Sequence, residues 1–390
     1  MRRFTVALIL LAVLTMPFSF LTYAEEKVWK LGDRVVPGPL PPNMSAPIPQ
    51  LDIQKDVVYG TVEGVELKLD FAKPKLCKNQ KVPLVVFIHG GGWKSGDKGD
   101  SHLNKGGITM FYQLGFAFAS INYRLTPTYK FPAQVNDCKL AIRFLRTNAN
   151  KFGIDPDRIG IWGSSAGGHL VSILSTANDN DGLEGPGLEG VSSRIACVVD
   201  YFGPTDFSGI KGDYNNNNGI SMIKDFFGCD PWECPEIARL ASPVTYCDKD
   251  DPPMLIQHGD MDNLVPYSQG ESLAKHLFAV NVPCALIKVK NAGHGFAPIK
   301  RGTEIKPSYN EITKKTVYHL VRYLEPSTLG DLNLDGKIDL SDAIELAYLF
   351  GANGTDKSGQ AAIDTWNPLA DLVADGKIDL KDWNIFWKVW

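Results

Sequence analysis

The sequence predicts an α/β fold with a mostly parallel central sheet and helices on both faces, followed by a smaller module. Short apolar runs such as Leu84–Ile88 read as strands buried on both faces, which is typical of central parallel strands. Strand and helix signals then alternate along the chain, as in parallel strands joined by crossover helices. A change of composition at 326–330 marks the start of the second module.

The elements of the first domain, residues 52–326, follow in order. The alternating segment 65–71 is expected to form an outer antiparallel strand with residues 57–62. Further strands are predicted at 84–88, 116–123, 158–162, 196–201, 254–257 and 284–289, and helices at 135–148, from 169 onward, at 272–280 and at 311–324. Two irregular stretches, 178–193 and 207–225, interrupt the alternation, and the sequence leaves open whether they cover a substrate pocket or are solvated insertions.

The segment Gly163–Gly167 has the Gly-x-Ser-x-Gly pattern of a nucleophile on a sharp turn. Residues 158–162 before it predict a strand and residues 169–174 after it predict a helix, which is the setting that the motif requires. Small flanking residues allow the strained backbone that projects a hydroxyl above the sheet. The sequence therefore predicts Ser165 as a nucleophile that attacks a carbonyl carbon.

A second motif, His89–Trp93, reads His-Gly-Gly-Gly-Trp and follows an apolar strand. Attack on a carbonyl creates a negative oxygen, which backbone N–H groups stabilise when they are already aimed at it. Glycines let the backbone approach that oxygen closely. The N–H groups of Gly91, Gly92 and Ala166 are the predicted oxyanion receptor, and a glycine-rich turn without a catalytic role is the alternative.

A serine hydroxyl needs a histidine to take its proton and a carboxylate to orient that histidine. His294 lies in a glycine-flanked loop directly after a predicted strand and is the predicted base. Another predicted strand leads into two candidate acids, Asp260 and Asp262, of which Asp262 is favoured. The other histidines belong to the oxyanion loop, lie in predicted helices or lack such a loop: His89, His102, His169, His258, His276 and His319.

The chain order serine, aspartate, histidine is that of the α/β-hydrolases. Residues 52–324 resemble the esterase families grouped as α/β-hydrolase fold-3, of the hormone-sensitive-lipase type, and BD-FAE, which contains bifunctional feruloyl and acetylxylan esterases. The matching segments are 89–93, 120–125, 131–134, 162–170 and 258–262. In that family's pattern the aspartate three residues before Val-Pro is the acid, which maps onto Asp262.

The resemblance implies a serine carboxylesterase acting on plant cell-wall esters, acetyl groups on xylan or ferulate on its side chains, with no cofactor in catalysis. Three alternatives use the same residues: a general short-chain carboxylesterase, a formamidase or peptidase, and a non-catalytic binding protein with a hydrolase fold. Serine attack alone does not distinguish an ester from an amide. The net charge of −4 and the lack of a basic stripe argue against a nucleic-acid partner.

The N-terminus reads as an export signal. Arg2 and Arg3 precede an apolar stretch, and small residues at Thr22 and Ala24 fit cleavage after Ala24. A signal peptide at 1–24 predicts a secreted or periplasmic protein, and an uncleaved membrane anchor is the alternative. An extended arm, rich in Pro and Gly, is expected over 25–51. Among the seven cysteines, Cys229 and Cys234 are the best local disulfide candidates.

Residues 327–390 contain two loops with the ligand spacing of calcium-binding EF-hand loops. The predicted ligands are Asp331, Asn333, Asp335, Lys337, Asp339 and Asp342 in the first loop, and Asp371, Asp375, Asp379 and Asp382 in the second. Val373 cannot supply a side-chain ligand, so the second site should be weaker or empty. The duplicated unit, over 330–390, resembles a type I dockerin, which implies attachment to a cohesin-bearing scaffold. A self-contained calcium-stabilised tail is the alternative.

Overall fold

The structure is a computed structural model that describes residues 29–31, 34–37, 40–42, 45–101, 108–208, 217–349, 369–373 and 378–389. The predicted signal peptide at 1–24 and His102 lie outside the described residues. Within the described ranges, none of the helices has the length and apolar character needed to cross a membrane.

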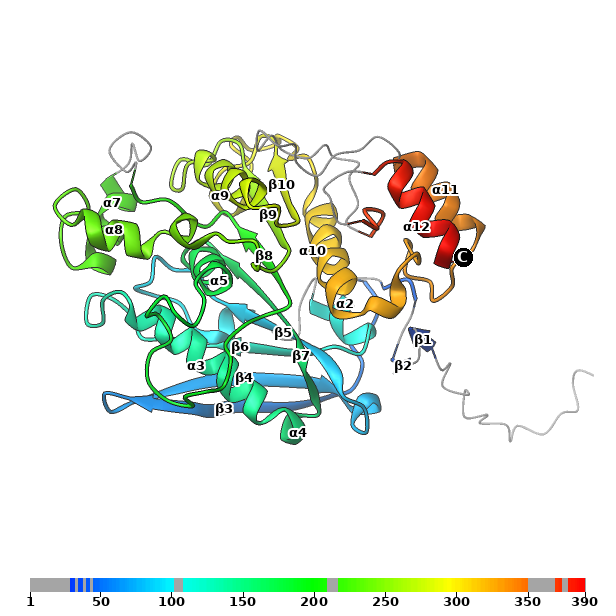
Figure 1. Cartoon of the computed structure of the whole chain (residues 1–390), viewed down its shortest axis with the longest axis horizontal. Coiled ribbons are helices and arrows are strands. Elements are labelled where there is room, and N and C mark those ends of the chain that lie inside the picture. Colours follow the sequence, from blue (N-terminus) through cyan, green and yellow to red (C-terminus); the bar gives the residue numbers. More distant parts are fainter. Residues whose placement is uncertain are drawn as a thin grey trace, which may run out of the picture.

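An eight-stranded sheet forms the centre of the molecule, in the order β10-β9-β8-β7-β5-β6-β4-β3 (Figure 1). The strands are β3 (Leu51–Val62), β4 (Val65–Pro74), β5 (Val82–Ile88), β6 (Ala117–Ile121), β7 (Ile154–Ser164), β8 (Cys197–Tyr201), β9 (Met254–Gly259) and β10 (Cys284–Val289). Neighbours among β5 to β10 are parallel, whereas β3 and β4 are antiparallel at one edge. This mostly parallel sheet fits the α/β-hydrolase fold that the sequence predicts.

The predicted hairpin forms, but β4 is not the outer strand. It lies between β3 and β6, because Leu69 to Ala72 pair with β6 as well as facing β3. Both strands of the hairpin extend beyond the predicted bounds, as far as the pair Leu51 and Pro74. The added pairing explains why β4 ends in a run of buried residues after its alternating first half.

Helices cover both faces of the sheet. The helices of the described residues are α2 (Ile108–Gln113), α3 (Ala133–Thr147), α4 (Ala149–Phe152), α5 (Ala166–Thr176), α7 (Asn217–Phe227), α8 (Pro235–Ala241), α9 (Ser268–Ala279) and α10 (Tyr309–Leu324), with α11 (Leu340–Leu349) and α12 (Leu380–Val389) in the C-terminal module. One apolar cluster joins α3, α5 and α9 to the sheet, and a second joins α2 and α10. Strand β5 serves both clusters, since Val86 belongs to the first and Val85 to the second.

The C-terminal module packs against the hydrolase domain. Leu332, Leu346 and Phe386 belong to the same apolar cluster as α10, and α11 and α12 lie beside that helix in Figure 1. The Arg322 guanidinium on α10 donates a hydrogen bond to the Leu372 carbonyl at 2.7 Å. The two predicted domains thus share one core where they meet.

The N-terminal arm is partly folded. A short antiparallel pair, β1 (Trp29–Leu31) and β2 (Arg34–Val36), occupies part of the range that reads as extended. Leu31 and Val36 are buried in the cluster of α10. The Arg34 guanidinium forms a buried ion pair with Glu325, at the junction between the two predicted domains.

The first irregular stretch, 178–193, is a packed loop on α3. The Glu184 carboxylate accepts hydrogen bonds from Lys139 at 2.5 Å and from Arg143 at 2.6 Å. Leu183 is buried in the main apolar cluster. These contacts hold the loop against the body of the domain.

Candidate active site

The predicted site residues meet because they follow parallel strands. Ser165 follows β7, the His89–Trp93 loop follows β5, Asp262 lies in the loop after β9, and His294 lies in the loop after β10. The carboxyl ends of parallel strands lie at one edge of a sheet, where α/β proteins place their ligands. Four separate segments of the chain are thereby brought together.

Ser165 lies on the sharp turn between β7 and α5. Its backbone has φ 57° and ψ −121°, outside the allowed regions for ordinary residues, which is the strain expected of a nucleophile turn. Its own N–H donates to the Tyr201 carbonyl at 2.8 Å, and its carbonyl accepts from His169 N at 2.9 Å. These two hydrogen bonds hold the strained turn between the neighbouring strand and the helix.

Ser165, His294 and Asp262 form one hydrogen-bonded line. His294 Nε2 lies 2.9 Å from Ser165 Oγ, and His294 Nδ1 lies 2.7 Å from Asp262 Oδ2. In the described part of the chain, His294 meets Asp262 and not Asp260. With Nδ1 protonated toward the carboxylate, Nε2 has its lone pair directed at the serine hydroxyl, which is the arrangement that activates a serine.

The Asp262 carboxylate is fixed by its own loop. Its Oδ1 accepts hydrogen bonds from the N–H groups of Leu264 and Val265, both at 2.9 Å. His258, which sequence reasoning set aside, is buried beside it, with Nε2 3.6 Å from Asp262 Oδ2. The His258 Nε2–H donates to the Val265 carbonyl at 2.9 Å. Burial lowers the pKa of His258 to about 4, so this histidine adds no positive charge near Asp262 at neutral pH.

The glycine loop, His89–Trp93, closely approaches the serine turn, Gly163–Gly167. A Cβ at Gly90 would lie 2.8 Å from the Ser164 carbonyl oxygen, so only glycine fits at that position. Gly91 and Gly92 have φ angles of 99° and 60°, which glycine adopts without a steric penalty. Ala166 begins α5, where backbone N–H groups have no partner within the helix.

Two aromatic pairs support this loop, of which the first is stacked and the second meets edge to face. His89 stacks on Tyr123 with ring centroids 4.3 Å apart, and the Tyr123 hydroxyl donates to the His89 carbonyl at 3.0 Å. Trp93 Nε1–H donates to His169 Nδ1 at 3.2 Å, while His169 Nε2–H donates to the Ala241 carbonyl at 2.8 Å. Burial lowers the pKa of His169 to about 4. A neutral His169 can therefore keep accepting the Trp93 hydrogen bond.

A small apolar pocket of about 20 Å³ opens beside Ser165. It is lined by Gly92, Trp93, Ser165, Ala166, Pro204, Gly219, Met222, Ile223, Leu264 and Val265. Gly91 is not among the lining residues. Met222 and Ile223 come from α7, so the second irregular stretch, where it is described, contributes a wall of the pocket. Sequence reasoning named neither residue, because nothing in that stretch marks them chemically.

The family of the chain follows from comparison with known proteins. The family described as BD-FAE matches residues 69–277, more than half of the 390 residues. The chain belongs to the BD-FAE family.

This BD-FAE protein is 28% identical over 244 residues to Esterase LipQ of Mycobacterium tuberculosis, covering 62% of the chain and 56% of LipQ. The chain thus spans about half the length of that curated relative. Among solved structures, it is similar to a truncated form of carbohydrate esterase from gut microbiota, with 30% identity, a TM-score of 0.61 and coverage of 71% and 96% of the two chains. It is also similar to the thermophilic esterase Est2 of Thermogutta terrifontis, with 27% identity, a TM-score of 0.56 and coverage of 72% and 95%.

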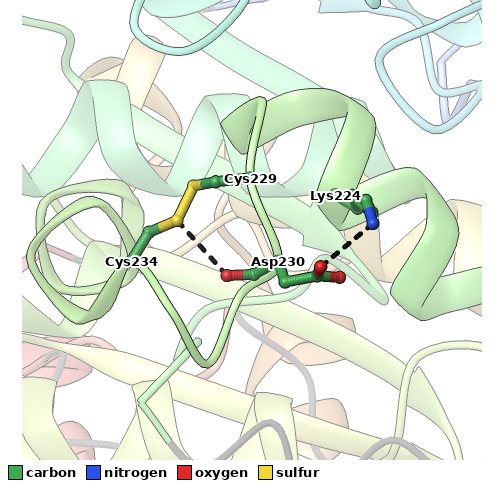
Figure 2. Close-up of a disulfide and its surroundings, with 4 residues drawn as sticks. All are labelled: Lys224, Cys229, Asp230 and Cys234. Carbon is green, nitrogen blue, oxygen red and sulfur yellow. Dashed lines mark hydrogen bonds and ion pairs between the residues drawn. A yellow bond between two sulfur atoms is a disulfide. The ribbon is translucent and has the colours of Figure 1, made fainter.

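A disulfide anchors the pocket wall of the BD-FAE protein. Cys229 and Cys234 are bonded between the end of α7 and the start of α8 (Figure 2). Asp230, inside the disulfide loop, pairs with Lys224 on α7 at 3.0 Å. Both contacts tie the helix that carries Met222 to the following segment.

The two C-terminal loops of the BD-FAE protein repeat the same hydrogen bonds. Asp339 N donates to Asp342 Oδ2 at 2.8 Å in the first loop, and Asp379 N donates to Asp382 Oδ2 at 2.7 Å in the second. Asp375 lies outside the described residues. The described side chains do not gather three His, Cys, Asp or Glu groups in a position to hold a metal ion.

The donor chemistry of the first loop nevertheless suits a cation. Asp331 and Asp342 are buried. Burial, together with the like charges of Asp342 and Asp335, raises the pKa of Asp331 to about 7. Calcium prefers such carboxylate oxygens, and its charge would compensate their burial.

Proposed function

We propose that this protein is a serine carboxylic ester hydrolase that removes acyl groups from plant cell-wall polysaccharides. The observation that carries the proposal is the hydrogen-bonded line from Ser165 through His294 to Asp262. The similarity to LipQ and to a carbohydrate esterase supports ester chemistry.

In the proposed reaction, Ser165 Oγ attacks the ester carbonyl while His294 Nε2 accepts the hydroxyl proton. Asp262 holds the His294 Nδ1–H and stabilises the imidazolium that forms. The N–H groups of Gly91, Gly92 and Ala166 are the proposed donors to the carbonyl oxygen as it becomes negative. His294 then passes its proton to the leaving alcohol, and a water molecule releases the acyl group by the same steps.

Within this proposal we favour a short acyl group, acetate above ferulate. The pocket volume of about 20 Å³ is little more than the space that one water molecule needs. Its walls include the apolar side chains of Met222, Ile223 and Leu264. A general short-chain carboxylesterase is the second candidate, because a small apolar pocket selects the acyl group and not the alcohol.

The test is the initial rate on acetylated xylan, methyl ferulate and 4-nitrophenyl acetate, with Ser165→Ala as the blank. The proposal expects serine-dependent release of acetate from xylan, and a lower kcat/KM for methyl ferulate. Cleavage of 4-nitrophenyl acetate alone would leave the second candidate. If none of the three substrates is hydrolysed in a serine-dependent way, the proposal is refuted.

We propose further that residues 1–24 direct export and that residues 327–390 bind calcium and attach to a cohesin-bearing scaffold. The repeated loops and the buried Asp331 support calcium binding. Calorimetric titration of Ca²⁺ into the chelator-treated protein tests calcium binding, with Asp335→Ala as the variant that should weaken it.

The predicted export signal is tested by mass spectrometry of the exported protein, which would show whether the protein begins at Glu25.

A further inference from the structure

A second and larger hollow lies at the opposite edge of the sheet from Ser165. It has a volume of about 450 Å³, and we name it the basic groove. Its lining residues are Asp52, Gln54, Phe71, Lys73, Pro74, Lys75, Lys78, Asn150, Lys151, Phe152 and Gly153. Gly153 directly precedes β7, and its carbonyl accepts from Val82 at the start of β5. The groove is therefore at the amino ends of the parallel strands, whereas Ser165 is at their carboxyl ends.

The floor of the groove is built from fixed groups. Lys73 is buried, and its Nζ donates to the carbonyls of Gln80 and Gly153, both at 2.8 Å. The rings of Phe71 and Phe152 pack below, with centroids 4.8 Å apart. These contacts join β4 to the segment after α4 and give the groove a rigid base.

The rim is positively charged. Lys75, Lys78 and Lys151 are exposed and come from two separate parts of the chain. Among the described residues, none of these three lysines forms an ion pair with a carboxylate, and Asp52 is the one acid among the lining residues. The whole chain carries a net charge of −4. Like charges gathered on one hollow of an acidic protein raise the local potential and attract an anion.

We propose that the basic groove binds a carboxylate-bearing segment of a polysaccharide. Its volume suits an extended chain, whereas the Ser165 pocket suits one small group. Lysine ammonium groups act as point charges for spaced carboxylates, whereas paired phosphate recognition favours arginine, which does not line the groove. The amides of Gln54 and Asn150 can exchange hydrogen bonds with sugar hydroxyls. The choice of a sugar over a nucleic acid rests on the proposed function.

Binding at this distance from Ser165 would hold an acidic polymer while its esters reach the active site. The second contact raises the effective concentration of the polymer without altering the chemical step. Small esters would gain nothing from it. Salt should weaken the binding of the polymer to the groove, since the lysine charges on the rim are exposed.

The test measures the Kd of polygalacturonate for the full chain in a Ser165→Ala background, by calorimetry at low and high salt. Neutral galactan and single-stranded DNA are the comparison probes. The variant is Lys75→Ala/Lys78→Ala/Lys151→Ala, and the matched control is Lys275→Ala/Lys300→Ala/Lys314→Ala, which removes three exposed lysines outside the groove.

The groove variant should weaken polygalacturonate binding by about tenfold or more, the combined effect of three exposed ionic contacts, and the control should not. Absence of polygalacturonate binding, an equal loss in the control, or DNA bound as tightly through the same lysines would overturn the inference. Hydrolysis of 4-nitrophenyl acetate is measured separately with Ser165 present, and the groove variant should retain it. A failure of hydrolysis with binding intact would count against the proposed function alone.

Discussion

Trp93 of the glycine loop stacks on Phe226 of α7, with ring centroids 4.3 Å apart and ring planes 7° from parallel. Trp93 follows Gly92 directly, and Phe226 lies on the helix that carries Met222 and Ile223. Lys94 and Asp225 add an ion pair at 3.0 Å between the same two segments. The proposed oxyanion loop and the pocket wall are therefore joined as one unit.

Phe226→Ala should separate that unit. Loss of a buried ring should lower the free energy of unfolding by about 3–5 kcal/mol, and a displaced glycine loop should reduce turnover of 4-nitrophenyl acetate by about 10-fold to 100-fold. Phe111→Ala, which removes a buried ring from the other face of the sheet, is the control. It should cost similar stability and leave turnover unchanged at a temperature where both variants are folded. Equal turnover losses in the two variants would argue against the coupling.

Met222→Ala should broaden the acyl specificity. A Cβ placed on Gly92 would lie 2.6 Å from Met222 Sδ, so this side chain closes the pocket over the glycine loop. Its removal should raise the ratio of kcat/KM for butyrate over acetate esters by about tenfold, the effect of one or two accommodated methylenes. Met261→Ala, at an exposed methionine outside the pocket lining, should leave the ratio unchanged. An unaltered ratio in Met222→Ala would mean that the acyl group of the ester does not bind in this pocket.

Asp262→Asn should lower kcat by about 10⁴-fold, because an amide favours the wrong histidine tautomer. Asp260→Asn should change kcat by less than about twofold, since Asp260 makes no contact with His294 in the described structure. Circular dichroism checks that both variants fold. A large loss in Asp260→Asn with none in Asp262→Asn would reverse the assignment of the acid.

Asp200→Asn should stabilise the protein in a pH-dependent way. Burial raises the pKa of Asp200 to about 7, and its Oδ1 accepts from Gly203 N at 2.9 Å, a bond that an asparagine oxygen can keep. Between pH 4 and 7 the folded protein holds a proton that the unfolded chain has released, so rising pH destabilises the wild type.

The free energy of unfolding of Asp200→Asn, relative to wild type, should thus rise by about 1.4 kcal/mol per pH unit from pH 4 to 7 and then level off. Urea titrations across this range measure it. A difference that does not vary with pH would mean that Asp200 titrates normally.

The sequence predicted which residues lie together at the candidate site better than it predicted the residues around them. The Gly163–Gly167 turn and the loops of Asp262 and His294 were recognisable because each follows a buried strand, and parallel strands bring such loops to one edge. Met222 was not predicted, because the asparagines at the start of α7 do not indicate a helix. The shared core was also missed, because Leu332 and Phe386 read equally well as the interior of a separate small module.

The most direct measurement is the mass of the intact protein after incubation with a fluorophosphonate, for wild type and Ser165→Ala, followed by peptide mapping. Because an activated serine attacks phosphorus, the wild type should gain one phosphonyl group on Ser165 and the variant none. Failure of the folded wild type to react, or equal labelling of Ser165→Ala, would contradict the assignment of Ser165 as an activated nucleophile.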